Sequence, residues 1–167
     1  KATVEVMWTN TWYDPAVEKQ AALELLNKGC DVLEQHQDST AAQIAAQEKG
    51  AFCIGYNVAS PNAAPKAYLT APLFHWEVFY KDDVDAILNG TWQSRAYWEG
   101  LSSGMVSLDT LTDLCAPGTQ EAVDKMESKI ADGSFKIFAG PIADQNGDVK
   151  VAEGTTILIA QGGAAAA

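Results

Sequence analysis

The stretch "DPAVEKQAALELLNKGCDVLEQ", residues 14–35, reads as one complete helix followed by one strand. Asp14 is placed to cap the helix, and Pro15 occupies the first helical position, where the N–H that it lacks would have no intrahelical partner. Three apolar residues recur at helical spacing and predict a buried face: Val17, Ala21 and Leu25. Gly29 then ends the helix, and the residues that follow it are β-prone. The stretch therefore predicts a helix that leads directly into a strand.

Three further glycines follow predicted helices in the same way, because glycine adopts the left-handed conformation of a helix end without steric cost. They are Gly50, Gly90 and Gly133. The helices that they end are predicted over residues 39–49, 75–89 and 119–131, the first of them with Asp38 or Ser39 as its cap. Strands are predicted over residues 2–9, 30–35, 52–56, 67–71, 95–97 and 105–107. Strand and helix therefore alternate along the chain.

This alternation predicts an α/β fold, a parallel sheet flanked by helices with right-handed crossovers. Asn146-Gly147 is the pair of residues most typical of a two-residue hairpin turn, so we expect an antiparallel hairpin near the C-terminus. Because the connections are too short for two domains, residues 1–154 are predicted to form a single lobe, and residues 155–167 a tail of low information content. Trp8 lies within the alternation of the first strand, and we interpret it as a core residue.

Composition and charge exclude several classes of function. Eleven basic and 22 acidic residues give a net charge of −11 and a pI near 4.4, which disfavours binding to nucleic acid and to anionic membrane surfaces. No apolar run approaches the roughly 20 residues that span a bilayer. The three cysteines form no C-x-x-C pair, so we expect buried thiols and no metal site. No glycine-rich phosphate loop follows a strand, which disfavours a phosphorylated cofactor, and we assign no cofactor.

Polar and aromatic residues gather where the predicted strands end. Ligands of open parallel sheets bind beyond the carboxyl ends of the strands, so this concentration is the main functional signal in the sequence. The candidate ligand-binding residues are Asn10, Trp12, His36, Asp38, Tyr56, Asn57 and Trp76. Together they favour a small ligand with a flat face and little charge.

Each candidate also has a structural interpretation. Trp12 is either a platform for a flat ligand or a core residue, and Trp76 either faces the ligand or packs under the loop before its helix. Asp38 and Asn57 either hydrogen-bond a ligand or cap the next helix or turn. His36 could act as a general base, but no nucleophile motif such as G-x-S-x-G accompanies it, so we interpret it as a polar residue of the binding edge.

Four segments together resemble a known family: "WTNTWYDPAVEKQAALELLNKGCDVLEQHQDSTAAQIAAQEKGAFCIGYN", "PKAYLTAPLFHWEVFY", "ILNGTW" and "GPIADQNG". Over residues 4–154 the chain resembles the C-terminal lobe of the basic membrane protein family of ABC-transporter substrate-binding proteins, the purine-nucleoside-receptor-like lipoproteins. The resemblance implies a periplasmic-binding-protein fold of two α/β lobes, of which the N-terminal lobe is absent here. It also implies a protein without enzymatic activity, located outside the cytoplasmic membrane, that passes purine nucleobases or nucleosides to an ABC permease.

The resemblance also implies roles for individual residues. Trp12 matches the aromatic residue that stacks on the base, and residues 35–39 match the segment that lines the cleft. Gly55-Tyr56-Asn57 matches a G-x-D motif that contacts the ribose, with an amide in place of the carboxylate. A lysine of the nucleoside binders aligns with Phe74. These two differences favour a nucleobase or a related heterocycle over a nucleoside.

Two other functions remain open from the sequence. A nucleoside or glycoside hydrolase would use a pair of carboxylates such as Asp14 and Asp38, about 5 to 9.5 Å apart on either side of one ligand bond. A sensory binding lobe would share the fold and the ligand but would have no role in transport.

Overall fold

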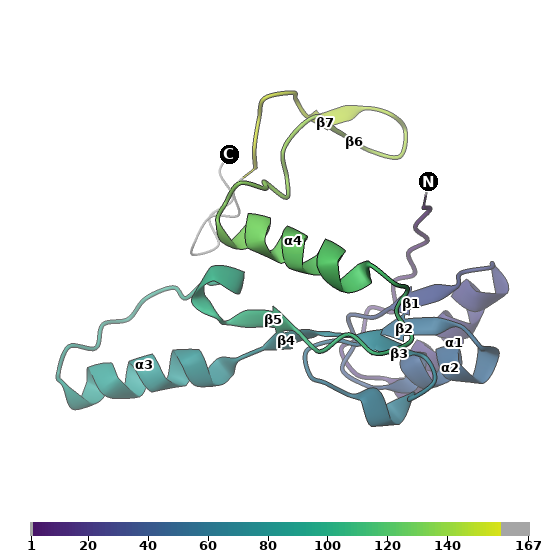
Figure 1. The fold of residues 1–167 in the computed structure, drawn as a ribbon, viewed down its shortest axis with the longest axis horizontal. Coiled ribbons are helices and arrows are strands. Elements are labelled where there is room, and N and C mark those ends of the chain that lie inside the picture. The colour runs from purple at the N-terminus through teal and green to yellow at the C-terminus, as the bar shows by residue number, and fades with distance from the viewer. Residues whose placement is uncertain (1, 158–167) are drawn as a thin grey trace. The chain divides into compact units, whose positions relative to one another are not determined.

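The computed structural model describes residues 2–157, and these residues form two compact units (Figure 1). The first unit contains the chain up to Phe74 together with Val106–Gln120. The second contains His75–Met105 and the chain from Glu121 onward. The backbone therefore passes between the units after residues 74, 105 and 120.

The first unit is built on a parallel sheet in the order β1-β2-β3. Its elements in chain order are α1 (Pro15–Asn27), β1 (Val32–Glu34), α2 (Ala41–Lys49), β2 (Phe52–Ile54), the short 3-10 helix η1 (Pro61–Ala63) and β3 (Tyr68–Thr70). In the register of the sheet Leu33 lies opposite Cys53, and Cys53 lies opposite Tyr68. The predicted α/β class, with a parallel sheet flanked by helices, is confirmed.

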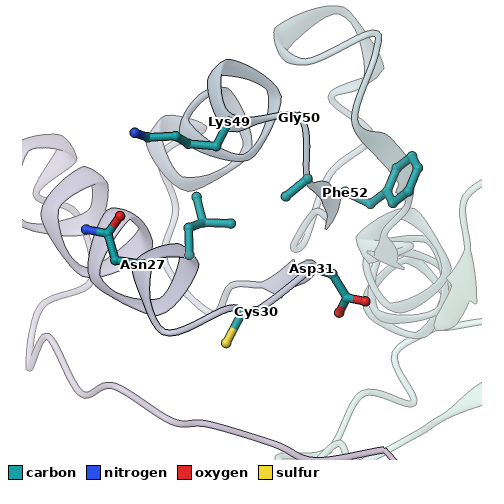
Figure 2. Close-up of a pocket in the computed structure, with 8 residues that line it drawn as sticks. Asn27, Cys30, Asp31, Lys49, Gly50 and Phe52 are labelled. Atoms are coloured by element: carbon teal, nitrogen blue, oxygen red, sulfur yellow. The ribbon is translucent and has the colours of Figure 1, made fainter.

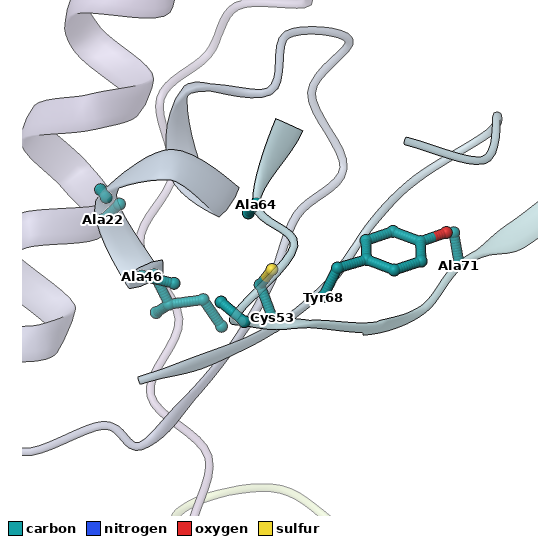
Figure 3. Close-up of a cluster of buried hydrophobic side chains, with 9 residues drawn as sticks. Ala22, Ala46, Cys53, Ala64, Tyr68 and Ala71 are labelled. Atoms are coloured by element: carbon teal, nitrogen blue, oxygen red, sulfur yellow. The ribbon is translucent and has the colours of Figure 1, made fainter. Parts of the chain in front are cut away.

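The core lies between this sheet and the two helices α1 and α2 (Figure 3). Its members are mostly small: Ala22, Leu33, Ala45, Ala46, Cys53, Ala64, Ala67, Tyr68 and Ala71. Tyr68 is the largest of them and is 1% exposed, and its hydroxyl donates a hydrogen bond to Asp109 Oδ2 at 2.8 Å. Small side chains on the helices allow their backbones to approach the sheet closely.

Local capping chemistry fixes the helix starts. Asp14 is the N-cap of α1 as predicted, and its Oδ1 accepts the N–H groups of Ala16 and Val17 at 3.2 Å each. At the start of α2 the N-cap position is occupied by Thr40, which makes no side-chain cap bond. Of the two predicted caps, Ser39 accepts the N–H of the first helical residue, Ala41, at 3.2 Å through its hydroxyl, and Asp38 does not cap the helix.

A second ladder in the first unit pairs β4 (Pro72–Phe74) with β5 (Val106–Leu108) in antiparallel fashion. β5 corresponds to the strand predicted over residues 105–107. β4 was not predicted, because Pro72 lacks an N–H and a proline is found in sheets only at edges or at strand starts. Here Pro72 is the first residue of the strand.

Two of the predicted strands are wrong. Residues 2–9 form no strand, and Trp8 is 82% exposed rather than part of the core. The reason is that alternation produces a strand only beside a partner strand, and within the described residues no strand pairs with this segment.

Residues 95–97 also form no strand. Arg95 and Tyr97 instead contact the helix α3 (Trp76–Leu88), through a 2.9 Å ion pair between Arg95 and Asp83 and a 4.6 Å ring contact between Tyr97 and Phe79.

The second unit contains α3, the 3-10 helix η2 (Leu101–Ser103), most of α4 (Thr119–Ala131) and a hairpin of β6 (Ile142–Ala143) with β7 (Val149–Val151). The hairpin turns at the predicted Asn146-Gly147, where Asp144 Oδ1 accepts the N–H groups of Asn146 and Asp148. The antiparallel C-terminal hairpin is thus confirmed.

Of the predicted tail, residues 158–167 lie outside the described residues. Among residues 2–157 the helices are too short or too polar to span a membrane.

Gly55→Ala should destabilise the first unit. A Cβ at this position would lie 3.0 Å from Tyr68 Cε2 and 3.1 Å from the Ala71 Cβ, inside the packed core. Overpacking of this kind is expected to lower the free energy of unfolding by about 1–3 kcal/mol, as measured by urea denaturation. Gly100→Ala is the control, because a Cβ there meets nothing within 4 Å and the φ of Gly100 is −136°. Equal stability of the two variants would contradict the prediction.

The buried thiol of Cys53 should make stability depend on alkaline pH. Burial raises its pKa to about 11 from the ordinary value of 9.0, so the folded state holds this proton more tightly than the unfolded state. The resulting stabilisation is complete below pH 9 and is lost as the pH rises from 9 to 11. Urea denaturation across this range should show a steeper loss for the wild type than for Cys53→Ala, and parallel curves would refute the assignment. The pKa of Tyr68 is also raised, chiefly by burial and by its hydrogen bond to Asp109, and both proteins keep these two causes.

Candidate ligand-binding rim

All predicted site residues except Trp76 lie in the first unit, at or beside the carboxyl ends of its parallel strands. We call three segments the rim: residues 9–14 before α1, residues 35–39 after β1, and residues 55–57 after β2. The rim contains the predicted residues Asn10, Trp12, His36, Asp38, Tyr56 and Asn57. Residues 35–39 and 55–57 come together because parallel strands end at one edge of a sheet. Residues 9–14 follow no strand and are joined to residues 35–39 by hydrogen bonds.

Hydrogen bonds join the turn that carries Trp12 to the loop after β1. The N–H of Asp38 donates to the carbonyl of Trp12 at 3.0 Å, and Gln37 Nε2 donates to Thr9 Oγ1 at 3.0 Å. Asn10 adopts a left-handed conformation, with a φ of 55°. The indole of Trp12 is 70% exposed although its backbone is held in this way. Trp12 is therefore a surface aromatic on a hydrogen-bonded backbone, so the core interpretation is wrong and the platform interpretation stays a prediction.

Aromatic rings from three segments form a row at the same edge. The ring centroids of His36 and Tyr56 lie 4.3 Å apart at an interplanar angle of 33°. The rings of Tyr56 and Phe74 are 6.3 Å apart and nearly perpendicular, at 87°. Phe74 was not among the predicted site residues, because the strand β4 that carries it was not recognised. Its position opposite Tyr56 adds an apolar surface to the rim.

Asn57 shapes the backbone at the end of β2. Its φ is 70°, a left-handed value that is uncommon for residues other than glycine and that asparagine tolerates better than most. Its carbonyl accepts the N–H of Phe74 at 3.4 Å, and it forms an isolated parallel bridge with Leu73. Asn57 thus connects β2 to β4, and its side chain remains half-buried at the rim.

The remaining predicted residues are placed differently. Asp14 acts as the helix cap, so its carboxylate is already engaged by two backbone N–H groups. Trp76 opens α3 in the second unit, is 49% exposed and stacks on Tyr80 at a centroid distance of 6.4 Å. Among the described residues no group of three or more histidine, cysteine, aspartate or glutamate side chains is arranged to hold a metal ion.

A separate hollow lies at the opposite edge of the sheet (Figure 2). It has a volume of about 370 Å³ and is lined by Leu26, Asn27, Cys30, Asp31, Lys49, Gly50, Ala51 and Phe52. These residues come from the C-terminal ends of α1 and α2 and from the entrances of β1 and β2. None of the predicted site residues lines it. We place the candidate site at the rim, because the aromatic row and the exposed indole lie there.

The sequence profile of one family, described as "ABC transporter substrate-binding protein PnrA-like", matches residues 1–138. This chain belongs to that family.

Two curated relatives extend the comparison. The chain is 35% identical over 144 residues to a purine-binding protein of Brucella abortus (strain 2308), which covers 86% of this chain and 41% of the relative. It is 32% identical over 148 residues to a putative ABC transporter glucose-binding protein of Haloferax volcanii, which covers 89% of this chain and 38% of the relative. This PnrA-like chain thus spans about two fifths of the length of the curated relatives that it matches.

Solved structures with the same fold have different roles. An ABC transporter solute-binding protein from Conexibacter woesei matches with a TM-score of 0.66 at 24% identity, over 81% of this chain and 46% of that one. A transcriptional activator of the comK gene from Bacillus halodurans also matches with a TM-score of 0.66, at 17% identity, over 77% of this chain and 46% of that one. At these identities the likeness shows the fold alone.

Two substitutions of Asn57 should separate its backbone role from its side chain. Asn57→Ala removes the amide and leaves a residue with a Cβ at a φ of 70°, which should lower the free energy of unfolding by about 1 kcal/mol. Asn57→Gly removes the same amide but accepts this φ, so its stability in urea denaturation should stay close to that of the wild type. If the two variants are equally stable, the left-handed backbone is not what Asn57 provides.

Proposed function

We propose that this PnrA-like chain is a ligand-binding lobe of an ABC-importer substrate-binding protein and that its rim binds a purine nucleobase or a closely related heterocycle. The observation that carries this proposal is the exposed indole of Trp12, whose backbone carbonyl is bound by Asp38 of the loop that also carries His36. The ring of His36 in turn pairs with that of Tyr56. A purine offers two flat faces, and aromatic rings bind such faces through burial and stacking.

Polar groups at the rim supply the hydrogen bonds that a purine requires at its edges. The carboxylate of Asp38 can accept from a ring or exocyclic N–H, and the amide of Asn57 can both donate and accept. Asn57 of the rim has an amide where the nucleoside binders of the family resemblance carry a carboxylate. Phe74, whose ring contacts that of Tyr56, has an uncharged ring where they carry a lysine. Both differences favour the nucleobase over the nucleoside. The printed name of the Brucella abortus relative, a purine-binding protein, supports the ligand class.

The transport role of the complete protein is part of the same proposal. We infer a second lobe, a permease partner and a location outside the cytoplasmic membrane, either in the periplasm or attached to the outer face of that membrane through a lipid anchor. Residues 1–154 then serve as one lobe of a two-lobe receptor. The family supports this inference through its description as ABC transporter substrate-binding proteins. A binding role without catalysis also agrees with Asp14, whose carboxylate caps α1 and so is a poor member of a hydrolytic pair.

Trp12→Ala should weaken purine binding. The loss of one aromatic stacking surface is worth about 1–3 kcal/mol for a base, or about 5-fold to 150-fold in the dissociation constant. Calorimetric titration of adenine, hypoxanthine, guanine and the matching nucleosides into the full-length protein measures this loss. Unfolding should hardly change, because the Trp12 side chain is 70% exposed.

Trp8→Ala is the matched control, because Trp8 is a tryptophan of similar exposure that lies just outside the rim. It should leave the affinity unchanged. Glucose is titrated in parallel, since the Haloferax volcanii relative is named as a putative glucose-binding protein. Binding of glucose without any purine would refute the ligand class, and equal affinity of the Trp12→Ala and wild-type proteins would refute the assignment of the rim.

A further inference from the structure

Glu18 is a buried carboxylate directly beneath the rim. It lies in the first turn of α1 and is only 3% exposed. Its two oxygens have different partners. Oε1 accepts the backbone N–H of Asp14 at 2.8 Å, and Oε2 accepts the hydroxyl of Ser39. One side chain therefore binds both the turn before α1 and the loop after β1.

Ser39 extends this connection into the loop. It is 7% exposed, and its hydroxyl also accepts the N–H of Ala41 at the start of α2. Its carbonyl accepts Gln35 Nε2 at 2.6 Å, and the same nitrogen donates to the carbonyl of Gln37 at 2.8 Å. Residues 35–39 are thus folded around buried side chains. The side chains of His36 and Asp38, which lie between these anchors, remain exposed at the rim.

The bonds of Glu18 differ in strength from the other links between the turn and the loop. The bond from Asp38 N–H to the Trp12 carbonyl and the bond from Gln37 to Thr9 lie among exposed or half-buried residues, where water can replace a lost partner. The acceptor at Glu18 is a buried carboxylate. Hydrogen bonds to such a group are about twice as strong as neutral ones, and their loss leaves buried donors unsatisfied.

Burial of a carboxylate is unfavourable unless hydrogen bonds compensate it. An apolar residue at position 18 would fill the same space beneath the rim without that penalty, but it would connect neither Asp14 nor Ser39. The N-terminal end of α1 offsets part of the penalty, because its backbone N–H groups create a partial positive charge there. What the glutamate provides at this position is therefore a fixed relation between two segments of the rim.

We propose that Glu18 is a positioning residue for ligand binding. It holds the turn of Trp12 and the loop of His36 and Asp38 in one arrangement, acting through Asp14 and Ser39 without touching the ligand. A binding surface that is already ordered loses less entropy when the ligand binds, so this arrangement should raise the affinity. The part of the inference that concerns affinity rests on the proposed function.

Glu18→Ala and Ser39→Ala test the inference in the full chain, with two readouts. The first is amide hydrogen exchange at Asp14, Asp38 and Ala41, which should accelerate roughly tenfold in Glu18→Ala, while exchange at Cys53 in the core stays the same. The second is purine affinity by calorimetry, which should fall by about tenfold or more. Glu18→Gln should lie between, because its carbonyl can still accept from Asp14 whereas its amide donates to the Ser39 hydroxyl.

Glu48→Ala is the matched control. Glu48 also connects to α1, through a 2.9 Å ion pair with Lys19, but both of these side chains are about half exposed and neither belongs to the rim. This variant should change neither readout. If Glu18→Ala does not fold, Glu18→Gln and Ser39→Ala carry the test on their own.

The two readouts keep this inference separate from the proposed function. Unchanged exchange at Asp14 and Asp38 in the folded Glu18 variants would overturn the inference, and so would faster exchange with unchanged purine affinity. If the wild type binds no purine, the proposed function fails by itself. Exchange then still decides whether Glu18 fixes the rim: a local acceleration at Asp14 and Asp38 supports it, and its absence overturns it.

Discussion

The close packing of α1 and α2 on the parallel sheet is the constraint on which the first unit depends. Alanines on the two helices, Ala22, Ala45 and Ala46, bring the backbones near the sheet, and Gly55 continues this close approach beyond β2. With the helices so placed, each strand passes into a short loop that must turn back at the same edge. Two of these loops, residues 35–39 and 55–57, belong to the rim, and residues 9–14 join them through hydrogen bonds to residues 37 and 38. The polar and aromatic composition of the rim can vary while the alanine core fixes where these two loops lie.

Features that depend on local chemistry were predictable from the sequence, and features that depend on distant partners were not. The Asp14-Pro15 start of α1 and the glycine-terminated helices agree with the prediction because capping involves only neighbouring residues. The strand predicted over residues 2–9 is absent because strand formation requires a partner from elsewhere in the chain. At the rim, topology was enough to locate Tyr56, which follows β2. Trp12 was expected there after a strand that is absent, and its turn lies at the rim because its carbonyl accepts the N–H of Asp38. Phe74 was not predicted as a site residue, because the strand that carries it begins with a proline and was not recognised.

Glu18 shows the same limit for a polar residue. On the sequence it is an acidic residue in the early part of a helix, which is typical of a solvated position that interacts with the helix dipole. In the structure it is buried, and Ser39, which is 21 residues away along the chain, donates to its second oxygen. No periodicity connects these two residues. The residues that would touch a ligand could therefore be proposed from position, whereas the residue that holds them in place became visible only from the contacts.

Exposure alone does not single out a binding residue in this chain. Trp8 is 82% exposed, more than Trp12 at 70%, and it follows a segment that forms no strand. What separates the two tryptophans is the backbone: the carbonyl of Trp12 accepts the N–H of Asp38, and two residues later Asp14 is held by Glu18. An exposed ring on an ordered backbone can bury apolar surface against a ligand without the entropy cost of ordering a mobile segment. A single rim covers only one face of a flat ligand, so high affinity requires a second surface on the other face, which is the contribution that we propose for a second lobe.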